Sequence, residues 1–323
     1  MTKVILIQRT GGPEVLTLDS VELRPPGPGE VRVRHAAIGV NFIDTYHRSG
    51  LYAVPLPAVL GVEAAGTVEA VGTGVDLAPG TRVAYATAGT GAYAETRLVA
   101  ADRLVPLPTT VGDELAAAAL LKGMTAEMLV RRVVEVRAGD VAVVHAAAGG
   151  VGSILTQWLK VLGARAIGIV SSEQKAILAR ANGCEHVLFS GKDDLVARVR
   201  ELTDGHGARV VYDSVGKATL PSSLDMVRSR GLVVSYGNAS GKPDPVDPLT
   251  LGAKGSLFLT RPVLNEYTKT REELLASARA LFEVLGSGAV KVRIGQRYPL
   301  ADAAQAHRAL EGRHTTGSTL LLP

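Results

Sequence analysis

The chain has 323 residues, too many for one compact core, so we expect two domains. Hydrophobic residues make up 46% and charged residues 20%, a balance that excludes an intrinsically disordered chain. The net charge is +4, and the basic residues are spread along the chain, which suits an anionic small ligand better than nucleic acid.

The single cysteine, Cys184, limits both redox chemistry and metal binding. It excludes a disulfide within the chain and a thiolate zinc site, so a reducing cytoplasm is the expected location and a packed thiol the expected role. The longest apolar region, 141–159, is interrupted by His145, several glycines and Gln157, so we expect no membrane span.

The first third of the chain is rich in short strand-like runs separated by glycine and proline. This spacing predicts a compact, barrel-like β domain. The runs rich in valine, alanine and threonine are 3–8, 30–40, 64–72, 81–87 and 93–100.

A helical pattern over 113–133 begins a second kind of sequence, in which strands alternate with helices. Continuous apolar strands in such alternation predict a parallel sheet covered on both faces, a doubly wound α/β fold. The expected strands are 140–148, 165–171, 186–190, 209–216, 232–238 and 255–262, and the expected helices between them are 149–163, 173–183, 192–205 and 219–231.

The last part of the chain returns to the first pattern. A long helix should begin after Thr270, which with Glu273 can form a capping box. A strand, turn and helix over 293–312 and a strand over 318–323 follow. We therefore expect a discontinuous domain, 1–121 and 263–323, interrupted by a nucleotide-binding domain, 122–262, with a ligand site in the cleft between them.

The stretch Ala147–Gly152, AAGGVG, aligns with the dinucleotide fingerprint G-x-G-x-x-G. Ala147 takes the first glycine position, where alanine fits if φ stays negative. Gly149 and Gly152 take the second and third, which serve backbone approach to a pyrophosphate and packing of helix on strand. Preceded by a strand and followed by a helix, the motif predicts a dinucleotide at the helix N-terminus.

The residues after the second strand favour NADPH over NADH. A carboxylate usually follows this strand in NAD enzymes, whereas here Ser171, Ser172 and Lys175 follow it. Hydroxyls and an ammonium group bind a 2′-phosphate, which a carboxylate would repel. Lys175 could equally be a solvated charge on its helix.

Several stretches resemble one family along residues 11–323, among them GGPEVL, NFIDTYHRSGLY, LGVEAAGTVEAVG, LLKGMTAEMLVRR, VHAAAGGVG, VVYDSVG and TTGSTLLLP. The chain is similar to the zinc-free medium-chain dehydrogenases/reductases, and within them to the bacterial NADPH:quinone oxidoreductases related to zeta-crystallin. The resemblance implies a GroES-like, β-barrel-type catalytic domain plus a doubly wound Rossmann domain, and metal-free reduction of a quinone by NADPH.

The resemblance also bears on zinc. Alcohol dehydrogenases of the superfamily carry a G-H-E motif whose histidine binds the catalytic metal. The comparable stretch here is GVEAAG, with Val62 in the histidine place, so no metal is expected. A quinone needs orientation over the nicotinamide more than polarisation by a metal.

Particular residues are implied in the site by this resemblance. A loop beginning at Asn41 is similar to one that faces the nicotinamide, and Tyr46, Arg48 and Tyr52 are candidates to line the quinone pocket. The catalytic candidates are Asn41, Asp44, Tyr46, Arg48 and Tyr52. The cofactor-binding candidates are Phe42, Ile43, Thr125, Gly149, Gly150, Val151, Gly152, Ser171, Lys175, Ser190, Val215, Tyr236, Gly237, Asn238, Arg261, Val263 and Arg313.

Some structural alternatives stay open. Tyr46 and Tyr52 could be packing residues, and Asp44 could be a partner of Arg48 across one helical turn. His145 is expected to be a buried histidine satisfied by the backbone. Ser190 stands where relatives often have a tyrosine near the 2′-phosphate, which would weaken the NADPH preference.

Two other functions remain as alternatives. One is NADPH-dependent reduction of an activated C=C bond, in an enone or enoyl thioester. The other is an RNA-binding or structural role like that of zeta-crystallin relatives, which no basic–aromatic motif supports. The apolar run 255–262 would be a sheet edge, so we expect a homodimer that joins two sheets.

Overall fold

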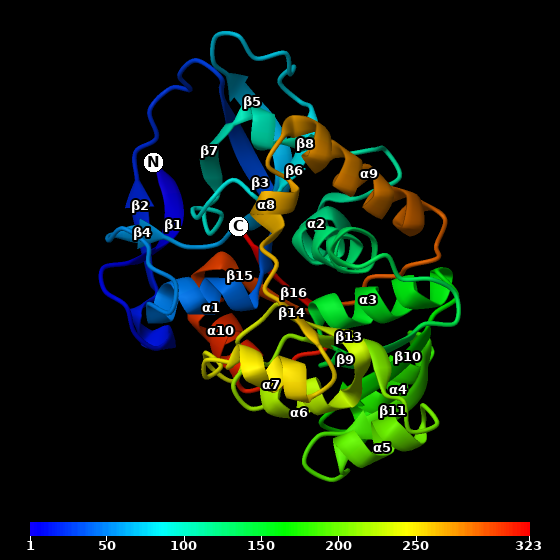
Figure 1. The fold of residues 1–323 in the computed structure, drawn as a ribbon. Coiled ribbons are helices and arrows are strands. Elements are labelled where there is room, and N and C mark those ends of the chain that lie inside the picture. The colour runs from blue at the N-terminus through cyan, green and yellow to red at the C-terminus, as the bar shows by residue number, and fades with distance from the viewer. The chain divides into compact units, whose positions relative to one another are not determined.

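The computed structural model describes all residues, 1–323, and the chain forms two compact units (Figure 1). Unit 1 is discontinuous and comprises 1–124, 268–287 and 292–323. Unit 2 comprises 125–267 and 288–291. The chain passes from unit 1 to unit 2 within helix α2 (Asp113–Glu127).

Unit 1 contains the β-rich part of the chain, in two sheets. A three-stranded antiparallel sheet has the order β2 (Thr17–Val21), β1 (Thr2–Ile7) and β4 (Ala58–Val59). The larger, seven-stranded sheet has the order β15 (Ile294–Pro299), β16 (Ser318–Leu322), β3 (Glu30–Val40), β5 (Glu63–Val71), β6 (Arg82–Tyr85) and β8 (Val105–Pro106), while β7 (Thr96–Ala100) also pairs with β3. The C-terminal strand β16 therefore pairs with β3 from the first domain, as the sequence pattern suggests.

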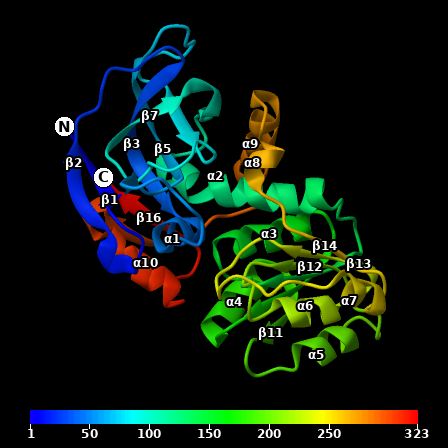
Figure 2. The same cartoon turned by 60° about the vertical axis from the view of Figure 1, so that its left-hand side comes forward.

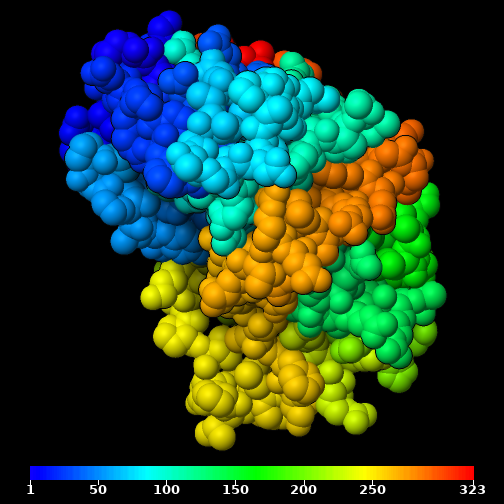
Figure 3. Space-filling model, turned by 90° about the horizontal axis from the view of Figure 1, so that it is seen from above, coloured from blue at the N-terminus to red at the C-terminus, as the bar shows by residue number.

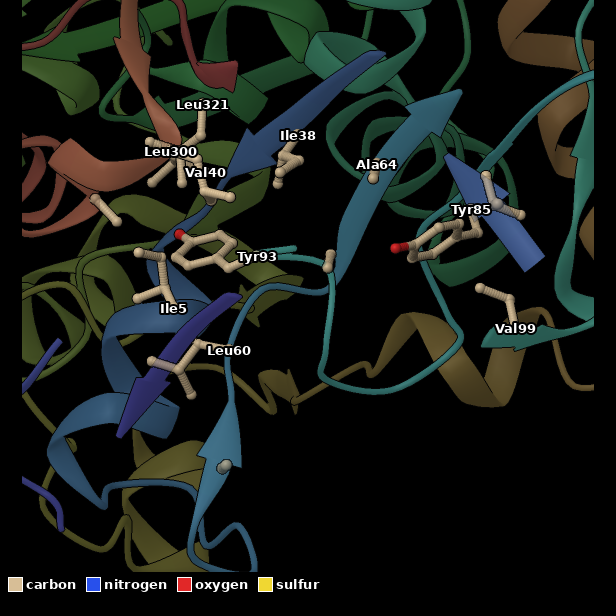
Figure 4. Close-up of a cluster of buried hydrophobic side chains, with 14 of the residues drawn as sticks. Ile5, Ile38, Val40, Leu60, Ala64, Tyr85, Tyr93, Val99, Leu300 and Leu321 are labelled. Atoms are coloured by element: carbon tan, nitrogen blue, oxygen red, sulfur yellow. The ribbon is translucent and has the colours of Figure 1, made fainter. Parts of the chain in front are cut away.

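The core of unit 1 is apolar but includes two fully buried tyrosines, Tyr85 and Tyr93. Tyr93 lies beside Ile5 and Val40, with Leu60 nearby (Figure 4). A buried phenol needs a partner for its hydroxyl, so each tyrosine brings a polar contact into the apolar core.

Four main helices belong to unit 1: α1 (Phe42–Ser49), most of α2, α9 (Arg271–Gly286) and α10 (Ala303–Glu311). Helix α9 begins with the predicted capping box: the Thr270 side chain accepts from the Glu273 N–H, and the Glu273 carboxylate accepts from the Thr270 N–H. It packs on β8 and the 3-10 turn Ala101–Arg103, and Figure 3 shows its orange surface beside the cyan-green part of unit 1.

Unit 2 is built on one parallel sheet, which confirms the doubly wound prediction. Its order is β11 (Cys184–Phe189), β10 (Arg165–Val170), β9 (Val141–His145), β12 (Ala208–Asp213), β13 (Val227–Ser235) and β14 (Phe258–Thr260). The order reverses between β9 and β12, and ligands of such sheets bind at the carboxyl ends of strands beside the reversal.

Helices cover both faces of this sheet (Figure 2). Helix α3 (Gly150–Val161) packs with α4 (Glu173–Ala181), and α5 (Leu195–Glu201) packs with α6 (Leu220–Met226). Trp158 on α3 is buried. Cys184 on β11 is buried as expected, and burial raises the pKa of its thiol to about 12. The short helices α7 (Pro248–Ala253) and α8 (Leu264–Tyr267) complete the unit, and none of the chain's helices combines the length and apolarity needed to span a bilayer.

Candidate active site

The glycine turn joins β9 to α3 at the carboxyl edge of the unit 2 sheet. Gly149 is the N-cap of α3, and its N–H donates to the Ala146 carbonyl oxygen over 2.8 Å. A Cβ atom at Gly152 would lie 2.3 Å from that same oxygen, so only glycine fits where helix and strand end meet. The first-turn N–H groups of α3 are thereby left for an anion such as a pyrophosphate.

The left-handed residue of this turn is Ala146, with φ of 52°. Ala147, which replaces the first glycine of the fingerprint, is not in a positive-φ conformation, and so meets the condition under which alanine fits there. The strained position therefore lies one residue before the aligned motif. Sequence alignment alone cannot show this shift, since alanine has no special preference for positive φ.

The residues predicted to bind a 2′-phosphate follow the next two strands. After β10, the Lys175 ammonium lies 3.3 Å from the Ser171 hydroxyl oxygen, and the Ser172 side chain caps helix α4. After β11, the Ser190 hydroxyl donates to the Val170 carbonyl over 3.2 Å. Serine side chains and one ammonium group thus meet at one edge, and the nearest acidic residue in sequence, Glu173, is exposed near Arg180. These groups fit a phosphate better than a ribose hydroxyl.

A buried polar cluster that the sequence does not predict joins the loop after β12 to the start of α6. The Asp213 carboxylate, fully buried, accepts from the N–H groups of Val215 and Gly216 over 2.9 and 3.0 Å. The hydroxyls of Thr219 and Ser223 donate to it as well, over 2.8 Å each. The only sequence signal was the position of this aspartate at the end of a predicted strand.

His145, at the end of β9, completes this cluster. Its Nε2 lies 3.0 Å from the Ser223 hydroxyl oxygen. Because that hydroxyl donates to Asp213, His145 must be the donor to Ser223. The expected burial of His145 is confirmed, but the expected backbone partner is wrong, because a serine side chain from α6 takes that place.

The remaining predicted cofactor residues of unit 2 lie on loops that pack on each other. The Tyr236 N–H donates to the Asp213 carbonyl over 2.8 Å, and a Cβ at Gly237 would lie 2.3 Å from the Ser214 carbonyl oxygen. The Arg261 guanidinium donates to the Ser235 carbonyl over 2.8 Å, and Val263 is exposed. The predicted residues at Val215, Tyr236, Gly237 and Asn238 are therefore brought together at the carboxyl ends of β12 and β13.

In unit 1, the segment expected as a loop from Asn41 is instead helix α1. Asn41 is its N-cap, and the Asn41 N–H donates to the Asp44 carboxylate over 2.8 Å. An N-cap followed three residues later by a carboxylate is a helix-start signal that could have been seen in the sequence. The helix ends at Gly50, which has φ of 82°.

Aromatic rings gather on α1 and the residues after it. The Tyr46 and Tyr52 ring centroids are 5.3 Å apart at an interplanar angle of 69°, and the Phe42 ring lies 6.4 Å from Tyr46. Tyr46 is 8% exposed, and Phe42 and Tyr52 are half-buried. These three rings form an aromatic cluster, which is suited to an apolar planar ligand. The catalytic role of the two tyrosines stays a prediction.

Asn41 and Arg48 have other partners than a ligand. The Asn41 amide donates to the Gly39 carbonyl over 3.3 Å and to the Glu63 carboxylate over 2.9 Å, which uses both of its hydrogens. The Arg48 guanidinium, 3% exposed, binds both oxygens of Glu311 over 2.9 and 2.7 Å. The alternative pairing of Arg48 with Asp44 is therefore wrong, because helix α10 supplies the partner.

A chain of hydrogen bonds connects Arg48 to Asp44 through the core of unit 1. Arg48 lies 3.1 Å from His307 Nδ1, and Tyr93 Oη lies 2.9 Å from both His307 Nε2 and Asp44 Oδ2. Since a guanidinium can only donate, His307 Nδ1 accepts and Nε2 carries the hydrogen. The direction is therefore Arg48 to His307, His307 to Tyr93, and Tyr93 to Asp44.

Asp44 is the last acceptor in this series of hydrogen bonds, and its carboxyl group is only partly hydrogen-bonded. Both donors reach Oδ2, while Oδ1 is buried without a partner. Burial raises the pKa of Asp44 to about 7, against the lowering effect of its hydrogen bonds from Asn41 and Tyr93. Burial also lowers the pKa of His307 to about 3, so this histidine is neutral.

A buried ion pair lies beside Val62, the residue that stands where alcohol dehydrogenases have their zinc-binding histidine. The Glu63 carboxylate, fully buried beside Val62, accepts from the Lys122 ammonium over 3.1 Å and from the Leu121 N–H over 2.6 Å. No three histidine, cysteine, aspartate or glutamate side chains are grouped as metal ligands in this chain. These residues therefore do not fit a zinc ion.

The other predicted residues lie at element ends. Thr125 is half-buried in α2, Ile43 is half-buried in the first turn of α1, and Arg313 is exposed after α10 with φ of 59°. Most of the predicted residues fall into two sets, one on and after α1 in unit 1 and one on the loops at the carboxyl edge of the sheet in unit 2. Thr125 and Arg313 lie outside both sets.

Comparison with known proteins gives two family matches. Residues 27–109 match the alcohol dehydrogenase GroES-like domain, and residues 150–277 match the zinc-binding dehydrogenase domain. A quinone oxidoreductase of Pseudomonas aeruginosa is 51% identical, with all of both chains covered. A 2-haloacrylate reductase of a Burkholderia species is 44% identical over all of this chain and 99% of that protein. The crystal structure of Escherichia coli quinone oxidoreductase with NADPH superposes with a TM-score of 0.98 at 47% identity, covering both chains completely.

Proposed function

Because the chain belongs to the zinc-free quinone oxidoreductases of the medium-chain dehydrogenase/reductase superfamily, we propose that it reduces quinones with NADPH. The observation that carries the proposal is the carboxyl edge of the unit 2 sheet, where a dinucleotide turn adjoins serine hydroxyls and a lysine in place of a carboxylate. The full-length likeness to quinone oxidoreductases supplies the substrate class.

Each unit contributes its own part of the binding chemistry. The turn at Gly149–Gly152 and the N-terminus of α3 would hold the pyrophosphate, and Ser171 with Lys175 the 2′-phosphate. NADPH, when bound, supplies a hydride from its nicotinamide. The Asp213 carboxylate fastens the loop after β12 through its hydrogen bonds to Val215 and Gly216.

The aromatic cluster of unit 1 would orient the quinone. Phe42, Tyr46 and Tyr52 offer flat apolar surface, and a tyrosine hydroxyl can donate to the oxygen that gains negative charge. A donor role for Asn41 is less well supported, since its amide hydrogens are engaged by Gly39 and Glu63. Quinones accept a hydride readily, so orientation supplies most of what the reaction needs.

The test is consumption of NADPH, beside NADH, with a simple para-quinone and excess chelator. We expect turnover with NADPH that the chelator does not change, and slower turnover with NADH. Tight NADPH binding without quinone turnover would contradict the proposal that quinones are the substrate, but it would agree with the proposal that NADPH is the cofactor. Absence of NADPH binding would contradict the whole proposal.

A second candidate is reduction of an activated C=C bond. The 44% identity to a 2-haloacrylate reductase favours it, since that relative is as complete a match as the quinone oxidoreductases. A panel of para-quinones, enones and 2-haloacrylates at equal concentration separates the two. The substrate with the highest kcat/KM decides between them.

We propose in addition that the chain is a homodimer joined through β14. This strand is the edge of the unit 2 sheet, and Phe258 on it is 61% exposed. An apolar edge of this kind pairs readily with a second copy. Light scattering should give twice the chain mass for the natural protein and the single mass for Phe258→Lys. A monomeric natural protein at micromolar concentration would contradict the proposal.

The expected cytoplasmic location stays a prediction from the single cysteine.

A further inference from the structure

A hollow of about 680 Å³ lies in unit 2 at the amino ends of the sheet strands, the edge opposite the glycine turn. Strands β9, β10, β12 and β13 begin at it, and the loop 203–207 after α5 forms one wall. Its size is within the usual range for small-molecule sites. Its lining includes four arginines, Arg165, Arg200, Arg209 and Arg228, which is the feature that needs an explanation.

Two of these arginines are already satisfied within the fold. Arg165 binds both oxygens of Glu185 over 2.8 and 3.0 Å. Arg200 donates to four backbone carbonyls, those of Gly205, His206, Asp225 and Val227, over 2.8 to 3.2 Å. Arg200 therefore holds the wall of the hollow in shape and has little capacity left for a ligand.

The acidic residues of the lining do not neutralise the other two arginines. Asp140 accepts from the Arg137 N–H over 3.0 Å. Asp204 acts on Arg165, whose pKa is raised first by Glu185 and further by Asp204. The guanidinium groups of Arg209 and Arg228 form no hydrogen bond or ion pair within the chain.

Arg209 and Arg228 are also neighbours. Ala208 of β12 is in register with Val227 of β13, and the register shifts directly after this pair. Arg209 and Arg228 each follow one member of the pair at the start of adjacent strands, and both line the hollow. Two guanidinium groups that line one hollow repel each other when no acidic side chain pairs with them. An anion between the two guanidinium groups would remove this repulsion and take up their unused donors.

We propose that this hollow binds the phosphate group of a small molecule, with Arg209 and Arg228 as its two ligands. Guanidinium groups match phosphate oxygens through paired hydrogen bonds. The lining contains no phenylalanine, tyrosine or tryptophan on which a base could stack. This favours a small phosphorylated ligand over single-stranded nucleic acid.

The experiment is calorimetric titration at constant ionic strength, with the full chain saturated with NADPH so that the predicted cofactor site is occupied. The probes are inorganic phosphate, AMP and adenosine. We expect saturable binding of phosphate or AMP and none of adenosine. Equal affinity for phosphate and AMP would identify the free ion as sufficient, and tighter binding of AMP would identify a phosphate ester.

The variant Arg209→Gln/Arg228→Gln should weaken the binding by about tenfold or more, since hydrogen bonds to charged groups are lost. The matched control is Arg9→Gln/Arg131→Gln, which removes the same charge at exposed arginines away from the hollow. If the double variant fails to fold, Arg209→Gln and Arg228→Gln are tested separately in the same titration. Equal binding by both double variants, no binding of phosphate or AMP by the natural protein, or binding of an RNA oligonucleotide alone would each overturn the proposal.

Discussion

Each unit contains a buried aspartate, and the two carboxyl groups differ in how fully they are hydrogen-bonded. Asp213 of unit 2 has donors at both oxygens, from two backbone N–H groups and two hydroxyls. Asp44 of unit 1 has two donors at Oδ2 and none at Oδ1. Burial of a carboxylate costs free energy unless hydrogen bonds replace its water, so Asp213 suits the charged form and Asp44 does not.

The two clusters also differ in how far apart their residues lie in the sequence. His145 and Ser223 of unit 2 are 78 positions apart, at the end of β9 and in α6. Arg48 and His307 of unit 1 are 259 positions apart, on helices from opposite ends of the chain. A parallel sheet brings strand ends together by rule, whereas the core of unit 1 depends on how distant elements pack.

The largest effect is expected at the glycine turn of unit 2. Gly152→Ala places a Cβ where the Ala146 carbonyl and the Ala147 backbone leave no room. We expect a loss of about 1–3 kcal/mol in the free energy of unfolding and a fall of at least about tenfold in NADPH affinity. Denaturant unfolding and NADPH fluorescence titration measure the two effects.

The control for this variant is Gly252→Ala, in helix α7, where nothing lies within 4 Å of the added Cβ. Both unfolding and NADPH binding should stay close to those of the natural protein. Equal behaviour of the two variants would contradict the close-packed turn.

The same substitution at the two aspartates should act in opposite directions. Asp213→Asn keeps an oxygen for the two N–H donors but puts an NH2 group against the hydroxyl donors of Thr219 and Ser223. It should cost about 1–3 kcal/mol of unfolding free energy at neutral pH and weaken NADPH binding. Asp44→Asn removes a carboxyl that is costly to ionise, and should stabilise the protein at neutral pH. A loss of stability in both variants at pH 7 would show that Asp44 is as well satisfied as Asp213.

The pH dependence of Asp44→Asn gives a second check. The pKa of Asp44 is about 7 in the folded protein, above the unfolded value of about 3.9. Between these values the unfolded chain is ionised and the folded one protonated, so the stability contributed by Asp44 is lost as the pH rises. The advantage of the asparagine variant should grow by about 1 kcal/mol or more from pH 4 to 7, and urea unfolding at several pH values measures it.

A smaller effect separates packing from positioning in unit 1. Tyr93→Phe and Tyr85→Phe each remove a fully buried hydroxyl that bonds a histidine, His307 and His35 respectively. Each should cost about 1–3 kcal/mol of unfolding free energy. Only Tyr93→Phe also removes a donor to Asp44 at the start of α1, so only this variant should raise KM for the quinone, by several-fold. A rise of KM in both variants would contradict a specific link to α1.

The last effect is confined to one cofactor and is expected at the serine and lysine edge of unit 2. Lys175→Gln should raise KM for NADPH by about tenfold and leave KM for NADH unchanged, because only NADPH has a 2′-phosphate to bind. Lys160→Gln, an exposed lysine at the end of α3, is the control and should change neither value. If Lys175→Gln behaves like this control, the Lys175 ammonium group faces solvent and does not bind the 2′-phosphate.

Much of the fold could be predicted because it depends on local patterns. The apolar strands and intervening helices of unit 2, the capping box at Thr270 and Glu273, and the glycine turn all follow from residues close in sequence. The family resemblance predicts a loop where helix α1 lies, although Asn41 as N-cap and Asp44 three residues later are a local signal for a helix start. The shift of strain to Ala146 had no signal at all.

The sequence by itself determined the class of fold, the dinucleotide turn, and the choice of serine and lysine over a carboxylate after β10. These depend on strand period, glycine size and charge, which are properties of neighbouring residues. Only the tertiary structure decided that Arg48 pairs with Glu311, that Lys122 neutralises Glu63, and that His145 bonds Ser223. A buried polar side chain takes whichever partner the packing of distant elements brings within hydrogen-bond reach, and no local pattern records that choice.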